Sequence, residues 1–305
     1  MGDISNLEDV CKAFEGCDAV FHIAAAVGPY HSHPVFHKVN VVGTANVLTA
    51  MRKFKIPKLV AASTPSIFFD GYDISGKAPK DLKIVKPGHF LAAYAETKAE
   101  AERMVREACC DELLTVNVAP HQVYGPRDAL FLPALMDAAD KLRIMGNGNN
   151  LVSMSHVDNY SHGLILAHAA LYKGSPVLGK FYLVTDGKPV KMWDVFDRIV
   201  VRQGQKSVYQ KFKVPLFVCY AVAYLGSFVS YFTGWRFKLT PFNVTMLTID
   251  RWFDISDAER DLKYKPLKTF DQGWEETMQW FDKNTAFWKA CAAATFDTSG
   301  TKKRV

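Results

Sequence analysis

The sequence predicts an α/β protein in which a doubly wound parallel sheet is covered by helices. Short apolar runs alternate with helical patterns through the first half of the 305-residue chain, and this alternation is typical of strand–helix–strand units with parallel strands. The composition fits a large packed core, because 49% of the residues are hydrophobic and 22% are charged. These fractions exclude a disordered, collagen-like or coiled-coil chain.

The strands and helices are expected in a regular order. Pro120 ends the third strand, because a proline lacks the backbone N–H that an interior strand needs. From the N-terminus, the patterns predict a strand over 19–23, a helix from about Pro34, a strand over 58–62, a helix over 93–107 and a strand over 114–118.

The alternation becomes less regular after a turn signal at 146–149, where the sequence reads Gly-Asn-Gly-Asn. We therefore expect three parts. A parallel-sheet domain covers 1–140, a smaller and mostly helical part covers 141–283, and a small, polar tail covers 284–305.

A glycine-rich turn of the form G-x-G-x-x-G does not occur in the sequence. In dinucleotide-binding folds this turn follows the first strand, and its glycines let the backbone approach the pyrophosphate. If the sheet is of this kind, the chain is expected to start in the middle of it, without the first strand–helix–strand unit.

Charge and cysteines narrow the class of protein. The formal net charge is +6 and no run of five or more like charges occurs, so no nucleic-acid partner is predicted. The six cysteines show no C-x-x-C spacing and are expected to be reduced thiols in a protein that faces the cytosol. No metal site is predicted, because His31, His33 and His37 have no carboxylate or cysteine near them in the sequence.

Residues 214–235 contain no charged side chain. The stretch is long enough to cross a bilayer, which takes about 20 apolar residues, and its many aromatic residues suit a membrane interface. Pro215 and Gly226 favour a helix that lies on the membrane or re-enters it over one that spans it. The alternative is a buried helix or helical hairpin over a substrate pocket.

Tyr94 and Lys98 are the first candidates for chemistry. Four residues apart on a predicted helix, they project from one face. An ammonium beside a phenol lowers the pKa of the phenol from about 10 toward the range of a working acid–base catalyst. Hydroxyl residues at Ser63, Thr64 and Ser66 follow the second predicted strand, and open α/β sheets bind ligands at the carboxyl ends of their strands.

With these residues in this order, the sequence resembles the extended short-chain dehydrogenase/reductase family. Within it, the chain is most similar to the 3β-hydroxysteroid dehydrogenase branch, and there to the decarboxylating sterol-4α-carboxylate 3-dehydrogenases. The resemblance implies a Rossmann-type fold without its first βαβ unit, in which 1–140 bind NAD or NADP and 141–283 bind the substrate. It runs from about Gly2 to Asp282 and includes motifs at 22–25, 39–46, 120–128, 146–151 and 157–159.

The resemblance also implies a role for each motif residue. Tyr94 would take the proton of a substrate hydroxyl, and Lys98 would lower the pKa of that phenol and hold the nicotinamide ribose. Thr64 would hydrogen-bond the reacting oxygen, a role for which the neighbouring serines could compete. Asn40 would support the proton relay. The cofactor would lie against Asp3 and Ile4 at the adenine, Ala24 and Ala25 at the pyrophosphate, and Pro120 and Val123 at the nicotinamide.

The implied reaction is oxidation of the 3β-hydroxyl of a steroid or a 4α-carboxysterol. The Tyr94 phenolate takes the hydroxyl proton while a hydride leaves C3. A carboxylate at C4 makes the product a β-keto acid, whose carbonyl accepts the electrons released as carbon dioxide leaves.

The resemblance implies a location as well. Residues 214–235 would contact the lipid of the endoplasmic reticulum membrane, the catalytic part would face the cytosol, and a homodimer is allowed. The last four residues, Lys-Lys-Arg-Val at 302–305, resemble a dilysine retrieval signal. Two alternatives stay open. One is another extended-family reductase of small hydroxyl compounds, and the other is a catalytically silent binding protein that lacks the phosphate contacts of the glycine-rich turn.

Overall fold

A sheet of four parallel strands forms the centre of the protein, in a computed structural model that describes residues 2–28, 31–233 and 239–296. The strand order is β1–β2–β4–β8. Every residue of β4 is buried, as expected for a parallel strand with helices on both faces. The predicted α/β class is therefore confirmed. The strands are β1 (Val20–His22), β2 (Lys58–Ala62), β4 (Leu114–Ala119) and β8 (Phe181–Leu183).

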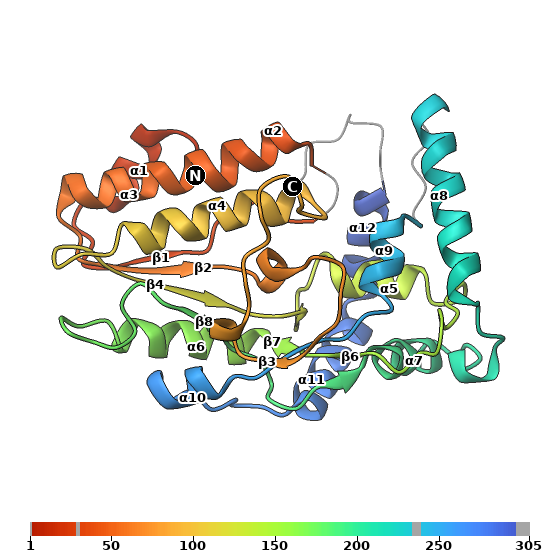
Figure 1. Cartoon of the computed structure of the whole chain (residues 1–305). Helices are drawn as coiled ribbons and strands as arrows, with labels where there is room; N and C mark the ends of the chain where they lie inside the picture. Colours follow the sequence, from red (N-terminus) through yellow and green to blue (C-terminus); the bar gives the residue numbers. More distant parts are fainter. Residues whose placement is uncertain (1, 29–30, 234–238, 297–305) are drawn as a thin grey trace.

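Helices cover this sheet on both faces (Figure 1). On one face, apolar side chains of three helices pack with the strands around Val47, Met51 and Leu59. On the other face, two helices close a second core around Val116 and Leu164. The first group is α1 (Leu7–Phe14), α3 (Gly43–Phe54) and α4 (Ala93–Glu107), and the second is α6 (Val157–Ala169) and α10 (Ser256–Asp261).

The helix predicted from about Pro34 is a continuous helical run with a π-helical middle. It consists of α2 (His33–Phe36), the π-helix η1 (His37–Val42) and α3. A π-helix widens one turn of the helix and frequently occurs at functional sites. Asn40 lies in this wide turn and is buried.

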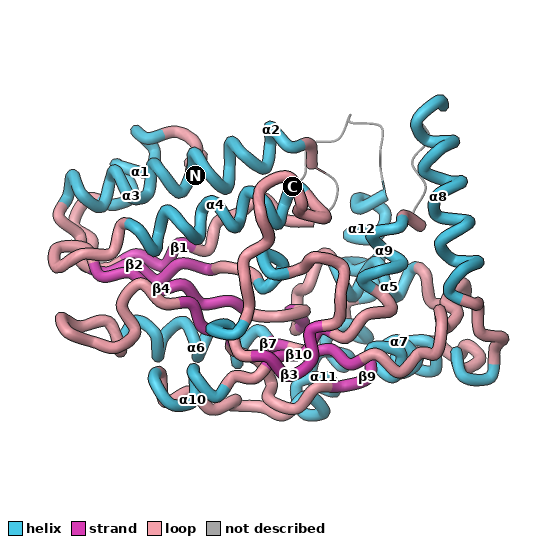
Figure 2. Tube along the Cα trace, in the orientation of Figure 1, coloured by secondary structure: helices cyan, strands magenta, loops and turns pink. Residues whose placement is uncertain are grey.

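The second part of the chain is less helical than expected. It contains a sheet of four short strands in the order β3–β10–β6–β9 and a parallel pair, β5 with β7 (Figure 2). Each strand has two to four residues, which is too short to give a readable alternation. The strands are β3 (Ile74–Lys77), β5 (Val123–Tyr124), β6 (Leu151–Val152), β7 (Ser155–His156), β9 (Val190–Lys191) and β10 (Arg251–Phe253).

The chain crosses between its two parts more than once, so the predicted division at residue 140 does not separate the two sheets. β3 comes from the first 140 residues but pairs with β10, whereas β8 comes from beyond residue 140 and pairs with β4. The core of the second part lies around Trp193 and Phe281. Its helical segments are α5 (Phe131–Asp137), α7 (Met192–Arg202) and α11 (Phe270–Lys283), with the short turn η4 (Val208–Gln210). Two other short turns pack against the central sheet and its helices, η2 (Pro65–Phe68) against α4 and η3 (Pro79–Asp81) against β8.

The segment predicted as a tail over 284–305 is helical in its first half. α12 (Thr285–Phe296) packs against α5, and Ala292 is only 2% exposed. Trp288 packs against the core of the second part. The tail prediction is therefore wrong for 285–296, because small residues there permit close helix packing. The dilysine pattern lies outside the described residues.

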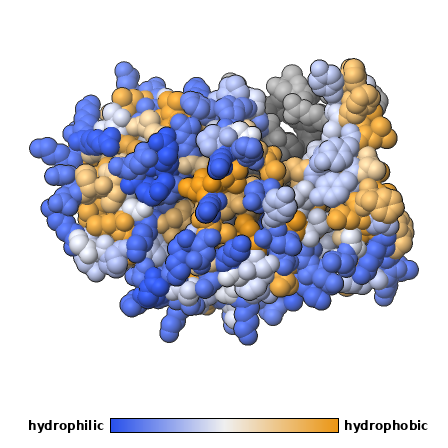
Figure 3. Space-filling view, in the orientation of Figure 1, coloured by the Kyte–Doolittle hydropathy of each residue, from blue (hydrophilic) through white to orange (hydrophobic). Residues whose placement is uncertain are grey.

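α8 (Leu216–Thr233) stands at the side of the molecule and carries an exposed apolar surface (Figures 1 and 3). It is the one helix of the described chain that is long and apolar enough to cross a membrane. Three small residues are buried in it, and two of them pack against Val244 of α9 (Pro241–Met246). The alternative of a buried helix is not what the structure shows. The buried residues are Cys219, Ala223 and Gly226.

α11 approaches the buried residues at the start of α6 through a glycine. A Cβ atom at Gly273 would lie 2.8 Å from His156 Cδ2 and 2.8 Å from the Tyr124 hydroxyl oxygen. Tyr124 is held in place, because its hydroxyl donates to Asp186 at 2.8 Å. The backbone N–H of His156 donates to the same carboxylate at 2.7 Å. Neither neighbour can move away cheaply, so only glycine fits at this position.

We expect Gly273→Ala to lower the free energy of unfolding by about 1–3 kcal/mol, the usual cost of overpacking. Alanine favours a helix over glycine by about 1 kcal/mol, so a net loss means that the clash dominates. Chemical denaturation measures the effect. Gln279→Ala, at an exposed position of the same helix, is the control and should stay within about 0.5 kcal/mol of wild type. Equal stability of the two variants would contradict the close approach.

Candidate active site at the carboxyl ends of the strands

Tyr94 and Thr64 meet at the carboxyl edge of the central sheet. Tyr94 lies in the first turn of α4, and Thr64 follows β2 and begins η2. The Thr64 hydroxyl lies near the phenol of Tyr94 and lowers its pKa. The Thr64 side chain also contacts Ser66, through a hydroxyl pair at 3.0 Å and a backbone N–H at 3.2 Å. Of the three hydroxyls named from the sequence, Thr64 is the one that affects the phenol, whereas the buried Ser63 hydroxyl has no hydrogen-bond partner in the part of the chain that the structure describes.

Lys98 lies one helical turn after Tyr94 and is 7% exposed. Its Nζ donates a hydrogen bond of 2.7 Å to the carbonyl oxygen of Ala62, the last residue of β2. The ammonium therefore lies at the end of the strand that carries Thr64. Burial lowers the pKa of Lys98 to about 8.

The phenol of Tyr94 is less acidic than the sequence suggests. Burial raises the pKa of Tyr94 to about 12, and the hydrogen bond from Thr64 opposes this rise because it stabilises the phenolate. The lowering of this pKa by Lys98 is not found in the structure. The physical reason is that the loss of solvation dominates, while the lysine ammonium is directed at the Ala62 carbonyl oxygen.

Asn40 connects the loop after β1 to α4. Its Oδ1 accepts from the Ala26 N–H at 2.8 Å, and its Nδ2 donates to the Ala26 carbonyl at 3.3 Å and to Thr97 Oγ1 at 3.2 Å. Thr97 lies between Tyr94 and Lys98 in the sequence and is 1% exposed. The amide of Asn40 thus holds the helix that carries both candidate residues. Sequence reasoning missed Thr97, although the threonine directly before Lys98 was a readable signal.

His22, at the end of β1, is a further buried group that sequence reasoning missed. Its Nε2 lies 2.9 Å from Thr44 Oγ1, and that hydroxyl donates to the Asn40 carbonyl at 2.6 Å. A hydroxyl has one proton, so Nε2 must carry the hydrogen and Nδ1 is left as an acceptor. Burial, and secondarily the charge of Lys98, lowers the pKa of His22 to about 3. The ring is therefore neutral at physiological pH.

Most of the residues expected to border a cofactor lie along the same edge, whereas Val123 lies in the separate β5–β7 pair. Asp3, Ile4 and Ala24 line one cavity of about 260 Å³ together with His22, and Ala25 follows Ala24 in the loop after β1. The Asp3 carboxylate accepts from the Ser5 N–H at 2.9 Å, which lowers its pKa. Pro120 follows β4 and Val123 begins β5. The N-terminal residues expected to contact the cofactor therefore lie close together. Pro120 lies directly after β4, the strand that pairs with β2.

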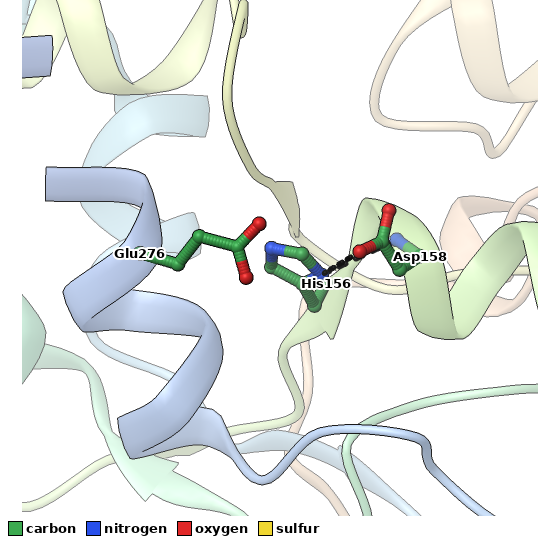
Figure 4. A group of neighbouring side chains, drawn as sticks. All are labelled: His156, Asp158 and Glu276. Atoms are coloured by element: carbon green, nitrogen blue, oxygen red, sulfur yellow. Dashed lines mark hydrogen bonds and ion pairs between the residues drawn. The ribbon is translucent and has the colours of Figure 1, made fainter. Parts of the chain in front are cut away.

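Histidine and carboxylate side chains come together in two groups of the described residues. Glu96 of α4 reaches His33 at 3.5 Å, a contact that their separation in the sequence does not reveal. The contact forms because α4 packs beside α2. A second group, His156, Asp158 and Glu276, brings its ligand atoms within 4.8 Å (Figure 4). In this second group, Lys268 Nζ donates hydrogen bonds to the carboxylates of Asp158 and Glu276. A lysine therefore supplies the positive charge that balances these two carboxylates.

The chain is similar to several known proteins. It is 32% identical over 290 residues to a protein of Mus musculus named sterol-4-alpha-carboxylate 3-dehydrogenase, decarboxylating, covering 92% of this chain and 79% of the relative. It is 33% identical over 289 residues to a 2-alkyl-3-oxoalkanoate reductase of Shewanella oneidensis, covering 89% of this chain and 72% of the relative.

Solved structures share the fold. A double mutant of DesIV, a dTDP-glucose 4,6-dehydratase of Streptomyces venezuelae with NAD bound, superposes with a TM-score of 0.71 at 20% identity, covering 95% of this chain and 81% of that one.

The family model described as the 3-beta hydroxysteroid dehydrogenase/isomerase family matches residues 1–216. This match covers Tyr94, Lys98, Thr64 and Asn40, and the chain belongs to that family.

Proposed function

We propose that the protein is an NAD(P)-dependent dehydrogenase that oxidises the 3β-hydroxyl of a steroid or a 4α-carboxysterol. The observation that carries the proposal is the position of the Thr64 hydroxyl near the Tyr94 phenol and beside the buried Lys98, in a member of the 3-beta hydroxysteroid dehydrogenase/isomerase family. The relative of Mus musculus whose name describes a decarboxylating sterol dehydrogenase supports the choice of substrate.

Each of the three side chains has a task in this reaction. Tyr94 accepts the proton of the substrate hydroxyl through its Oη. Thr64 donates to the oxygen that becomes a carbonyl and keeps it beside the phenol. Lys98 places a positive charge at the end of the strand that leads to Thr64, and this charge would favour the phenolate once a bound ligand offsets the lost solvation of the phenol. Asn40 is a positioning residue, because its amide bonds go to Ala26 and Thr97.

The residues present fit a nicotinamide dinucleotide, which supplies the hydride acceptor of the reaction. The cavity lined by Asp3, Ile4 and Ala24 offers a carboxylate oxygen and apolar walls for the adenosine end. Ala25 allows close approach of the backbone, and Lys98 supplies donors for ribose hydroxyls. Pro120, directly after β4, and Val123, at the start of β5, would border the nicotinamide end.

The second chemical step needs no further residue. When a carboxylate is bound to C4, oxidation at C3 produces a β-keto acid. The bond between C4 and the carboxylate breaks, its electron pair moves to the C3 carbonyl, carbon dioxide leaves, and the resulting enolate is protonated at C4.

A membrane location at the endoplasmic reticulum, with the catalytic part facing the cytosol, belongs to the proposal. α8 exposes seven large apolar or aromatic side chains whose exposed fractions exceed 50%, and an exposed apolar patch of this kind marks an interaction surface. A sterol dissolved in lipid would reach the site from that side. The seven are Phe217, Val222, Tyr224, Leu225, Phe228, Tyr231 and Phe232.

A second candidate is the reduction of a 3-oxoalkanoate, the reaction in the reverse direction on an open-chain substrate. It is favoured by the name of the Shewanella oneidensis relative, which is 33% identical. The exposed surface of α8 favours the sterol, because a small soluble substrate needs no access from lipid.

Tyr94→Phe should lower kcat for sterol oxidation by about 10²- to 10⁴-fold, the usual contribution of a positioned acid–base group. Binding of NADH or NADPH, measured by fluorescence titration, should change little because the ring remains. Tyr72→Phe, at a position 76% exposed, is the control. Unchanged turnover in Tyr94→Phe would remove this residue from the mechanism, and no cofactor binding by wild type would favour a silent protein.

Lys98→Met should have an effect that depends on pH. The pKa of Lys98 is about 8, so the ammonium is charged below this pH and neutral above it. The ratio of kcat/KM between wild type and Lys98→Met should therefore be large at pH 6.5 and should fall as the pH rises through about 8, since kcat/KM reports the free enzyme. A ratio that stays constant between pH 6.5 and 9.5 would mean that the charge of Lys98 has no catalytic effect.

A double variant, Phe217→Asp with Phe228→Asp, should bind lipid vesicles at least tenfold more weakly, because burial of one such ring contributes about 1.5–3 kcal/mol. Co-sedimentation with phosphatidylcholine vesicles that contain an anionic lipid measures the binding. Tyr72→Asp changes an equally exposed ring outside α8 and should leave binding unchanged. Similar losses in both variants would argue against α8 as the lipid contact.

A further inference from the structure

Within the described residues, Arg251 is a buried cation without an anionic partner. The residue begins β10 and is 6% exposed. No carboxylate of the described chain forms an ion pair with it. Its Nη2 donates to the Met246 carbonyl at 2.7 Å, its Nη1 lies 3.4 Å from His121 Nε2, and its buried Nε has no hydrogen-bond partner.

The guanidinium keeps free donors. It carries five N–H groups, and the two contacts above use two of them within the described residues. His121 does not compete for an anion. Its Nδ1 lies 2.7 Å from the Ser153 carbonyl and must donate to it, so the Nε2 lone pair faces Arg251. Burial, and then the charge of Arg251, lowers the pKa of His121 to about 3, so the ring is neutral.

Arg251 lies between the two loops that carry the candidate active-site residues. Its Cζ is 5.8 Å from the centre of the Phe69 ring, and Phe69 directly follows the η2 turn that starts at Thr64. His121 directly follows Pro120 at the end of β4. The loops after β2 and β4 therefore meet at Arg251, at the edge of the sheet where a substrate of Tyr94 must lie.

Burial of a charge costs free energy unless the charge is paired. An anionic ligand bound beside the Arg251 guanidinium would therefore offset this cost. The names of the two similar proteins describe the same chemistry. A sterol-4α-carboxylate that reacts at C3 and a 2-alkyl-3-oxoalkanoate both carry a carboxylate on the carbon next to the reacting carbon. Arginine is well suited to such a group, because its planar fork binds a carboxylate through two hydrogen bonds.

We propose that Arg251 binds the carboxylate of the substrate and thereby makes the enzyme specific for β-hydroxy acids. The inference rests on the proposed oxidation and deepens it. The carboxylate bound at Arg251 orients the neighbouring C3 hydroxyl toward Tyr94 and Thr64. When carbon dioxide leaves, the product loses the group that Arg251 holds, which favours its release over the binding of new substrate.

The test compares two 3β-hydroxysterols that differ only at C4, one with a 4α-carboxylate and one with a 4α-methyl group. Wild type should bind the carboxylated sterol at least about tenfold more tightly, since a hydrogen-bonded charge contributes about 1.5–3 kcal/mol. Arg251→Met should lose this preference in kcat/KM and in affinity by equilibrium dialysis. Arg251→Lys keeps the charge and should retain part of it. Arg103→Met, on the exposed side of α4, is the matched control and should keep the preference in full.

Equal affinity of wild type for the two sterols would overturn the proposal, whether or not the variants fold. Equal losses for both sterols in Arg251→Lys or Arg251→Met would do the same, because they indicate a purely structural residue. The two hypotheses can fail separately. Binding of the carboxylated sterol that depends on Arg251, without oxidation, would support the anion site and contradict the reaction. Oxidation of both sterols with equal kcat/KM would support the reaction and contradict the anion site.

Discussion

The docking of α4 against the carboxyl end of β2 is the contact on which the candidate site depends. One buried hydrogen bond, from Lys98 Nζ to the Ala62 carbonyl, ties the helix to the last residue of the strand. A second buried hydrogen bond, from Asn40 Nδ2 to Thr97 Oγ1, connects the same helix to η1. Because Tyr94 and Thr64 sit on these two elements, their hydroxyl contact follows from the docking. A shift of α4 by a fraction of a turn would separate the pair.

Burial has opposite effects on the groups of the site. It raises the pKa of Tyr94 to about 12 and lowers the pKa of Lys98 to about 8, so it works against a phenolate beside an ammonium. A charged ligand that enters the site restores part of the lost solvation, because preorganised dipoles and charges replace water. The Thr64 hydroxyl already acts in this direction. The acid–base power of Tyr94 therefore depends on the loaded site more than on the helix pair that the sequence displays.

The sequence predicted the parts of this architecture that local patterns encode. Helix 93–107 and strand 58–62 have the predicted bounds, because apolar periodicity and strand-end residues are local signals. The rule that ligands bind at the carboxyl ends of parallel strands predicted the position of Thr64, whereas its proximity to Tyr94 was implied only by the resemblance to the family. Pairing of β3 with β10 could not be read, since the strands lie about 180 positions apart and are only four and three residues long. The helix at 285–296 was missed because its contacts with α5 are tertiary. The raised pKa of Tyr94 and the lowered pKa of Lys98 were missed for the same reason, since burial depends on the whole fold.

The two buried cations at the carboxyl edge of the sheet, Lys98 and Arg251, have similar surroundings. Lys98 has the neutral His22 within electrostatic reach, and Arg251 has the neutral His121 beside it. Neither cation forms an ion pair with a carboxylate in the described part of the chain. A buried cation normally acquires a counter-charge, since its desolvation is otherwise uncompensated. In this protein the counter-charges are not supplied by the described side chains, and each histidine is kept neutral, so it adds no further positive charge. The edge is therefore built to receive negative charge at two positions. In the proposed reaction, a phenolate at Tyr94 would meet the first, and a substrate carboxylate next to the reacting carbon would meet the second.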